Sequence, residues 1–188
     1  MNFDFDAARR CFDDDPAGKD GDRFARYWLS LWHGDRLPMR AEFKPRAIAN
    51  LLPSICIFEV VPGKSVFCRL AGSHIVEGAG RDITGVDWLA LTPPENQAER
   101  LSRFSAVADG AIGRGVRAAR RLSGEHQLAE EIMLPFADVG GGGARQILTF
   151  IGWRQSVYDP AITGIPNTGG LLREFRLTAL KRDTATAA

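Results

Sequence analysis

Four side chains near the middle of the sequence are of types that could carry out acid–base chemistry: Glu125, His126, Glu130 and Glu131. A carboxylate beside a histidine can move protons as a general acid and base. The apolar pattern around them predicts a strand, in which Glu130 and Glu131 point to opposite faces and His126 lies about 13 Å from Glu130. We therefore interpret them as solvated strand charges and predict no catalytic residue and no enzyme activity.

The metal-ligating residue types are scattered along the chain. There are three histidines and three cysteines: His33, His74, His126, Cys11, Cys56 and Cys68. Zinc and similar ions need pairs of ligands at short, regular spacings, and none of these residues forms such a pair. We predict no metal site, and we interpret the cysteines as reduced thiols of a cytoplasmic protein.

Two patterns that bind phosphate or nucleic acid in other proteins are incomplete here. The glycine run 140–143 lacks the lysine and the following helix of a phosphate-binding loop, so we interpret it as a hairpin turn. Four arginines, Arg114, Arg117, Arg120 and Arg121, form the one basic cluster. On a strand they divide between the two faces, and the formal net charge is only +1. We predict no nucleic-acid partner.

The length and composition suit one domain with appendages. The chain has 188 residues, of which 45% are hydrophobic. Its longest apolar run, residues 54–61, is far shorter than the roughly 20 residues of a membrane-spanning helix. Residues 1–12 lack the apolar centre of an export signal. We expect a cytoplasmic protein without a membrane span.

The N-terminal third is predicted to contain two helices. Residues 1–21 carry six aspartates and are expected to be a loose leader. The flank at 22–53 follows, and its apolar residues recur at helical spacing: Phe24, Tyr27, Trp28, Leu31 and Trp32. This aromatic face packs either on its own domain or against a second copy or partner, and both alternatives stay open. A shorter helix follows over residues 45–53.

The predicted core, residues 54–155, contains five strands and one long helix. Strands at 54–61 and 65–71 form a hairpin, a helix covers 94–109, and three more strands follow. These last strands are expected at residues 114–122, 126–136 and 144–153. Short connections imply an antiparallel sheet with helices on one face, which is an α+β domain. In the C-terminal extension, 156–188, the stretch 171–182 favours a short helix over a strand.

A glycine-rich segment, residues 69–85, joins the second strand to the long helix. Four glycines in seventeen residues leave no room for a regular long helix. Asp82 and Thr84 are residue types that close turns by bonding nearby main-chain groups. We predict that the segment folds over the sheet as a lid, with a corner made by Ser73, Arg81, Asp82, Thr84 and Gly85.

The order of these elements is also the plan of a PAS domain. Five segments resemble a family of small, stand-alone, mainly alphaproteobacterial PAS-like proteins: Tyr27-Trp28, Gly34-Asp35-Arg36-Leu37-Pro38-Met39-Arg40, Leu51-Leu52-Pro53, Arg69-Leu70-Ala71-Gly72-Ser73 and Gly80-Arg81-Asp82-Ile83-Thr84-Gly85. The strand plan extends the match to about residue 155. Two departures stand out. Lysine replaces one acid of the family's Arg-x-Asp-x-Asp-Pro segment in Arg40-Ala41-Glu42-Phe43-Lys44-Pro45, and Ser73 replaces the usual threonine.

The resemblance implies a sensory or regulatory module with a small cavity between sheet and helices. We expect seven residues to line that cavity: Arg69, Trp88, Phe104, Ile132, Leu134, Phe150 and Trp153. Packing of these residues as an ordinary core is the competing interpretation. Haem in this fold usually needs a histidine on the connecting helix, and covalent flavin photochemistry needs a cysteine in the lid. Residues 94–109 have no histidine and the lid has no cysteine, so we expect neither cofactor and leave the ligand open.

Together these observations predict a PAS-like module that binds a small molecule, a protein partner or both. It would signal through helix packing or through homodimer contacts of the aromatic helix. One alternative is a structural adaptor whose cavity is filled by its own side chains. A weaker alternative is an enzyme acting on a small molecule.

Overall fold

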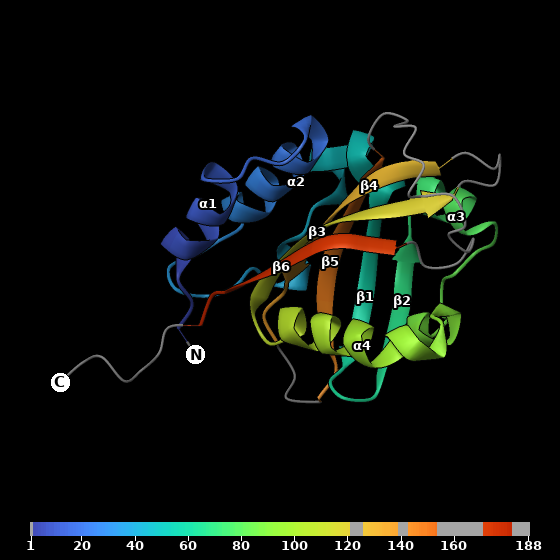
Figure 1. Cartoon of the computed structure of the whole chain (residues 1–188). Coiled ribbons are helices and arrows are strands. Elements are labelled where there is room, and N and C mark those ends of the chain that lie inside the picture. The colour runs from blue at the N-terminus through green and yellow to red at the C-terminus, as the bar shows by residue number, and fades with distance from the viewer. Residues whose placement is uncertain (1, 121–125, 139–142, 154–170, 182–188) are drawn as a thin grey trace.

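The computed structural model describes residues 2–120, 126–138, 143–153 and 171–181 (Figure 1). Glu125, Arg121, residues 140–142 of the glycine run and most of the C-terminal extension lie outside these ranges, and so do the side chains of Arg117, Arg120, His126 and Trp153. Predictions about those groups stay predictions.

Six antiparallel strands form one sheet, in the order β2-β1-β5-β4-β3-β6. Their bounds are β1 (Ile55–Val61), β2 (Ser65–Ala71), β3 (Ala111–Arg120), β4 (His126–Pro135), β5 (Arg145–Trp153) and β6 (Leu171–Ala179). The five predicted strands and the α+β class are confirmed, with β3 beginning three residues earlier than expected. The fold therefore follows the antiparallel plan, but with one strand more.

The sixth strand corrects the helix predicted over residues 171–182. β6 pairs antiparallel with β3, so that Phe175 lies opposite Gly115 and Ala179 opposite Ala111. The segment has both helical and alternating apolar patterns, and its pairing with β3 makes it a strand. Phe175 packs on one apolar core while Thr178, on the other face, hydrogen-bonds Cys11 at 3.4 Å.

One face of the sheet carries the connecting helix and the lid. These elements are α4 (Pro94–Ala108), α3 (Ser73–Ala79) and the 3-10 helix η3 (Trp88–Leu91). α4 agrees with the predicted helix to within one residue. The core beneath it includes Phe58, Met133 and Ile147, all nearly fully buried.

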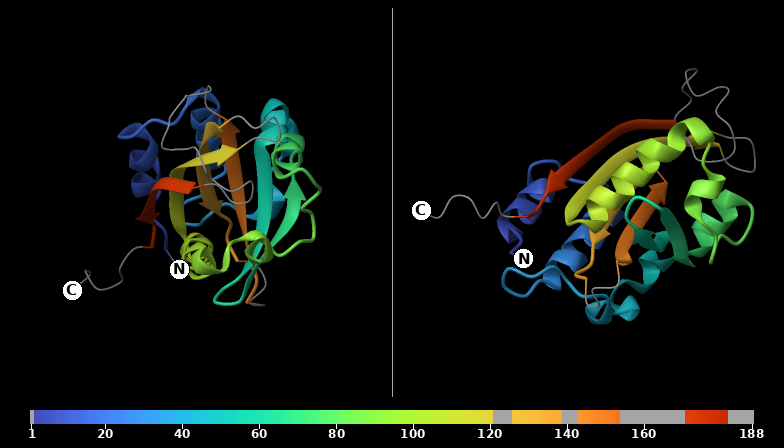
Figure 2. Two further views of the ribbon diagram at one scale, coloured as in Figure 1. Left: turned by 45° about the vertical axis from the view of Figure 1, so that its right-hand side comes forward. Right: turned by 90° about the horizontal axis from the view of Figure 1, so that it is seen from below.

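The opposite face is covered by the N-terminal segment, which corrects the expectation of helices on one face only. Four elements lie there: α1 (Phe5–Asp13), α2 (Lys19–Ser30) and the 3-10 helices η1 (Arg40–Glu42) and η2 (Pro45–Ser54). The sheet separates these blue and teal elements from α4 in Figures 1 and 2. The core on this side includes Ile57, Leu134 and Leu148. Because neighbouring strand residues alternate between faces, runs such as Ile132-Met133-Leu134 supply both cores.

The leader is not loose throughout, since residues 5–13 form α1. Asp4 caps this helix by accepting a hydrogen bond from the Ala7 amide at 2.9 Å. Ala8 and Phe12 are buried in the core that this helix shares with the sheet. The capping bond and the burial together explain why an aspartate-rich segment is helical here.

Glu42 links η1 to the preceding loop. It is the acid that the chain retains in its Arg40–Pro45 segment. Its carboxylate accepts hydrogen bonds from Arg36 Nη2 at 2.7 Å and Nη1 at 3.2 Å, and from the Met39 amide at 2.7 Å. The Arg36 side chain, followed by the Met39 amide, lowers the pKa of Glu42 against the opposing effect of burial. The retained acid therefore has a structural role.

Replacing Glu42 with glutamine should lower the free energy of unfolding by about 1 kcal/mol at pH 7, because the ion pair is only partly buried. A carboxyl whose folded-state pKa is lowered stabilises the fold above its unfolded pKa of about 4.3, and this contribution disappears as pH falls through the folded-state pKa. Urea unfolding of both proteins from pH 7 down to about pH 3 checks this. The difference should shrink on acidification, with the exposed Glu174→Gln as control; a pH-independent difference would contradict the assignment.

Candidate functional site

Of the seven residues expected to line one cavity, the six whose side chains the structure describes do not lie together. Trp88 and Phe104 belong to the core on the α4 side of the sheet. Ile132, Leu134 and Phe150 belong to the core beneath the N-terminal helices. A single cavity lined by all of them is therefore wrong. The sequence prediction placed Ile132, Leu134 and Phe150 on the face that carries the lid, whereas both faces of this sheet are apolar and buried.

Arg69 is an exposed residue of the edge strand β2 and faces no interior cavity. Its guanidinium pairs with Glu59 at 2.6 Å and lies over the ring of Phe67, 5.4 Å from the ring centroid. The side chain of Glu59 raises the pKa of Arg69 by accepting its hydrogen bond. This arginine is engaged with its neighbours on the sheet surface and is not an anion-binding group of the interior.

The interior on the α4 side is packed with aromatic rings and also holds charge. Phe58 contacts the rings of Trp88 and Phe104, with centroid distances of 5.7 Å and 5.1 Å. Arg100 is only 6% exposed, donates to Thr92 Oγ1 at 2.7 Å and lies over the Trp88 ring. The sequence analysis did not single out Arg100, although it shares a helical face with Phe104, four residues later.

Hydrogen bonds hold the lid corner against β2. Asp82 Oδ1 accepts from the Thr84 amide at 2.8 Å, and the hydrogen bonds from Thr84 lower the pKa of Asp82. The Gly85 amide then donates to the Cys68 carbonyl at 2.7 Å, so the corner lies directly beside β2. Two other residues of the predicted corner, Ser73 and Arg81, are exposed.

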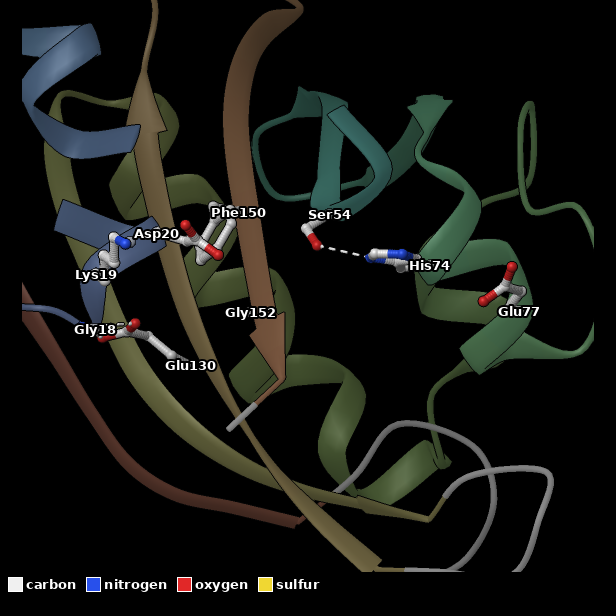
Figure 3. Close-up of a pocket in the computed structure, with 10 residues that line it drawn as sticks. Gly18, Lys19, Asp20, Ser54, His74, Glu77, Glu130, Phe150 and Gly152 are labelled. Carbon is white, nitrogen blue, oxygen red and sulfur yellow. Dashed lines mark hydrogen bonds between the residues drawn. The ribbon is translucent and has the colours of Figure 1, made fainter. Parts of the chain in front are cut away.

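A pocket of about 420 Å³ lies between α2 and the lid helix α3, which pack on different cores of the sheet (Figure 3). Its lining residues are Gly18, Lys19, Asp20, Gly21, Ser54, His74, Glu77, Glu130, Phe150 and Gly152. In Figure 3 the α2 residues and Glu130 stand on one side of β5, and Ser54, His74 and Glu77 stand on the other. Of the predicted cavity residues whose side chains the structure describes, Phe150 alone lines this pocket.

Glu130 anchors the α2 side of the pocket and corrects its interpretation as a solvated charge. It is 6% exposed, and its carboxylate accepts from the Gly18 amide at 3.1 Å and 3.3 Å. A Cβ at position 21 would lie 2.6 Å from Glu130 Oε2 and 2.9 Å from Ile132 Cδ1, so a larger residue there would have to displace these side chains. Glu131 is 4% exposed and faces the opposite side of the sheet.

On the α3 side, Ser54 Oγ and His74 Nδ1 are 3.2 Å apart and form a hydrogen bond that joins η2 to the lid helix. The pocket thus presents carboxylates, an imidazole, a hydroxyl, the Lys19 ammonium and the Phe150 ring. A few convergent polar groups around an aromatic surface are typical of sites for small polar molecules. The sequence did not indicate this pocket, because its walls come from five separate parts of the chain.

The aromatic face of α2 packs on its own domain. Phe24 and Trp28 are fully buried, and Trp32 is 9% exposed. Phe24 stacks on Phe150 at 5.4 Å, and Trp28 Nε1 donates to the Pro135 carbonyl at 3.1 Å. The proposed dimer surface is therefore wrong for these three residues, because the sheet already covers them.

The remaining two residues of that predicted surface are half-buried. Tyr27 Oη accepts from the Lys44 amide at 2.6 Å, and it lies 3.2 Å from the Lys44 carbonyl, to which it donates. Leu31 is the cap residue at the C-terminal end of α2. With the other three residues buried, these two do not form a continuous exposed aromatic surface on α2.

Two general features of the described residues bear on function. None of the helices there is long and apolar enough to cross a membrane. Nor do three or more His, Cys, Asp or Glu side chains gather in those ranges as ligands for a metal ion.

The family of the chain follows from a comparison of its sequence with protein families. A family model described as "PAS domain" matches residues 18–148, which is more than half of the chain. The chain therefore belongs to the PAS domain family, a family of sensory modules. No curated protein matches the sequence.

Several solved structures are similar to parts of the chain. The PAS domain of an HTR-like protein from Haloarcula marismortui is 19% identical, with a TM-score of 0.36 over 58% of this chain and 89% of that one. A variant of RsLOV is 16% identical, with a TM-score of 0.37 over 57% and 64%. The LOV protein of Rhodobacter sphaeroides is 15% identical, with a TM-score of 0.37 over 60% and 69%.

Proposed function

We propose that this protein is a non-catalytic PAS sensor in which a small molecule binds the pocket between α2 and α3. The occupant would alter how the N-terminal helices pack on the sheet, and a signalling protein in the cytoplasm would recognise that change. Membership of the PAS family supports the sensory role. The position of the pocket supports the mechanism, because it touches both the lid and the helical flank.

The observation that carries this proposal is that one pocket contacts two helices, α2 and α3, that are held to the rest of the domain by different interactions. α2 is held by its buried aromatic face and by the bond between Gly18 and Glu130. α3 is held to η2 by the bond between His74 and Ser54. A ligand that bridges them favours whichever arrangement of the two helices it binds more tightly.

A structural adaptor remains the second candidate, and a specific observation favours it. On the α4 side, Phe58, Trp88 and Phe104 pack against one another in the interior. A core filled in this way needs no ligand for stability. The two candidates differ in whether the purified protein carries or binds a small molecule.

Native mass spectrometry of freshly purified protein tests the sensor proposal. We expect a reproducible non-covalent adduct, and we expect the His74→Ala variant to lose most of it because a pocket wall is removed. His33→Ala is the matched control, since His33 is exposed and lies outside the pocket. A clean apoprotein mass, together with no thermal shift from any added compound, would favour the adaptor.

A further inference from the structure

Two of the three cysteines lie in the same core beneath the lid, at diagonal positions on adjacent strands. Cys56 lies on β1 and Cys68 on β2, and both are fully buried in the core on the α4 side. Cys68 is opposite Phe58, two residues along the same face from Cys56, and a β-bulge falls between these positions. The bulge adds local twist, which changes how side chains on the two strands approach each other.

The two thiols differ in character. Cys68 Sγ donates a hydrogen bond to the Leu70 carbonyl at 3.3 Å, and the neighbouring thiol shifts the pKa of each cysteine in the opposite direction. The hydrogen bond from Cys56 lowers the pKa of Cys68, while the same contact and then burial raise the pKa of Cys56. The Coulombic effect of the buried carboxylate Glu131 raises the pKa of Cys56 further. Cys68 is therefore the thiol that ionises first, and Cys56 is a protonated neighbour.

We propose that Cys56 and Cys68 are a modification site that forms an intramolecular disulfide when the protein meets a peroxide. The Cys68 thiolate attacks one oxygen of hydrogen peroxide, the O–O bond breaks, and the leaving hydroxide takes a proton to become water. The Cys56 sulfur then attacks the Cys68 sulfenic acid, losing its proton as the S–O bond breaks and water leaves. Two thiols and one peroxide give one disulfide and two waters.

A thiol pair of this kind suits a disulfide that forms and is reduced again. Disulfides in reducing compartments are mostly transient and redox-sensing, and a neighbouring second thiol resolves the sulfenic acid before further oxidation. The bond would join β1 to β2 covalently at the bulge, next to the lid. Neither cysteine lines the pocket between α2 and α3, so the disulfide is a separate site from that pocket.

The lid corner controls access to the pair. The Cys68 main chain bonds to the corner on both sides, through the Gly85 amide at 2.7 Å and the Val86 carbonyl at 3.1 Å. Asp82 closes the adjoining turn through the Thr84 amide. Because both thiols are fully buried, peroxide reaches Cys68 when this corner opens.

Alkylation of the full-length protein tests the disulfide directly. Reduced protein, freed of reductant, is treated with hydrogen peroxide, quenched with catalase, denatured and alkylated with N-ethylmaleimide. We expect the alkylated thiols to fall from three to one, with peptide mapping placing the label on Cys11 and a bridge between Cys56 and Cys68. Dithiothreitol should restore three. Three free thiols after treatment, a bridge through Cys11, or irreversible oxidation of Cys68 alone would overturn the proposal.

Cysteine variants assign the order of the two steps. Cys56→Ser should stop at a Cys68 sulfenic acid that dimedone traps, whereas Cys68→Ser should leave Cys56 unreactive. Cys11→Ser is the matched control and should form the same bridge as the wild type. The wild-type peptide map decides the question even where a variant fails to fold.

A lid variant tests the route of access. Asp82→Ala should raise the rate of bridge formation several-fold, because it removes the bond that closes the corner. The control is Asp35→Ala, which changes an exposed aspartate far from the lid in sequence. Equal rates in wild type and Asp82→Ala would overturn the route through the corner.

Discussion

Replacing Trp28 with alanine should lower the free energy of unfolding by about 3 to 5 kcal/mol, in the range of buried aromatic truncations. Trp28 is fully buried where α2 meets the sheet. Its ring lies 5.4 Å from Trp32 in a T-shaped arrangement, and its Nε1 donates to the Pro135 carbonyl. Alanine would leave a cavity beside Phe24 and an unpaired carbonyl at the end of β4.

Urea unfolding followed by circular dichroism measures this effect. Trp28→Phe should fall between wild type and Trp28→Ala, because it keeps most of the apolar volume and loses the hydrogen bond. Leu177→Ala is the surface control: Leu177 is 45% exposed on β6, so its change should stay within about 0.5 kcal/mol. A loss for Trp28→Ala as small as that of Leu177→Ala would mean that α2 does not anchor the flank to the sheet.

The anchoring role of Trp28 also shows which parts of the fold the sequence could predict. The spacing of Phe24, Trp28 and Trp32 predicted the helix, because large aromatic side chains that recur every four residues lie on one side of a helix. The spacing could not decide what the face packs against. That depends on whether the sheet offers a second apolar face, and runs such as Ile147-Leu148 on β5 carry this information.

Two elements were missed because their local signals were mixed. In α1, Ala8 and Phe12 are spaced as on a helix and Asp4 is a good cap, but the surrounding aspartates suggested a solvated leader. In β6, Phe175 and Leu177 alternate as in a strand while the preceding leucines fit a helix. Pairing with β3 decides the second case, and no local pattern reveals a partner strand some 60 residues away.

The candidate site was predictable only in part for the same reason. Phe150 was expected to line a cavity, and it does line the pocket between α2 and α3. Glu130 was interpreted as a solvated charge because strand carboxylates usually are. Its partner is the main-chain amide of Gly18, 112 residues away, and a backbone donor leaves no trace in residue types.

Gly72, by contrast, is visible in the sequence as one of the four glycines of residues 69–85, and it has a structural role. It directly follows β2, and its amide donates to the Ile55 carbonyl at 2.8 Å. A Cβ added there would lie 2.2 Å from the Leu52 carbonyl oxygen and 2.3 Å from that of Pro53. Its φ of −69° suits any residue, so space alone requires glycine. The lid therefore starts where the backbone at Gly72 lies very close to the backbone of Leu52 and Pro53.

Gly72→Ala should accordingly lower the free energy of unfolding by about 3 kcal/mol or prevent folding, because the groups in the way are backbone and cannot rotate aside. The neighbouring Ser73→Ala is the matched control: Ser73 is exposed, and its change should stay within about 0.5 kcal/mol. Thermal and urea unfolding of both variants provide the measurement. If Gly72→Ala folds with wild-type stability, η2 and α3 can separate at little cost, and the bond between Ser54 and His74 on the α3 side of the pocket would then not hold the lid in place.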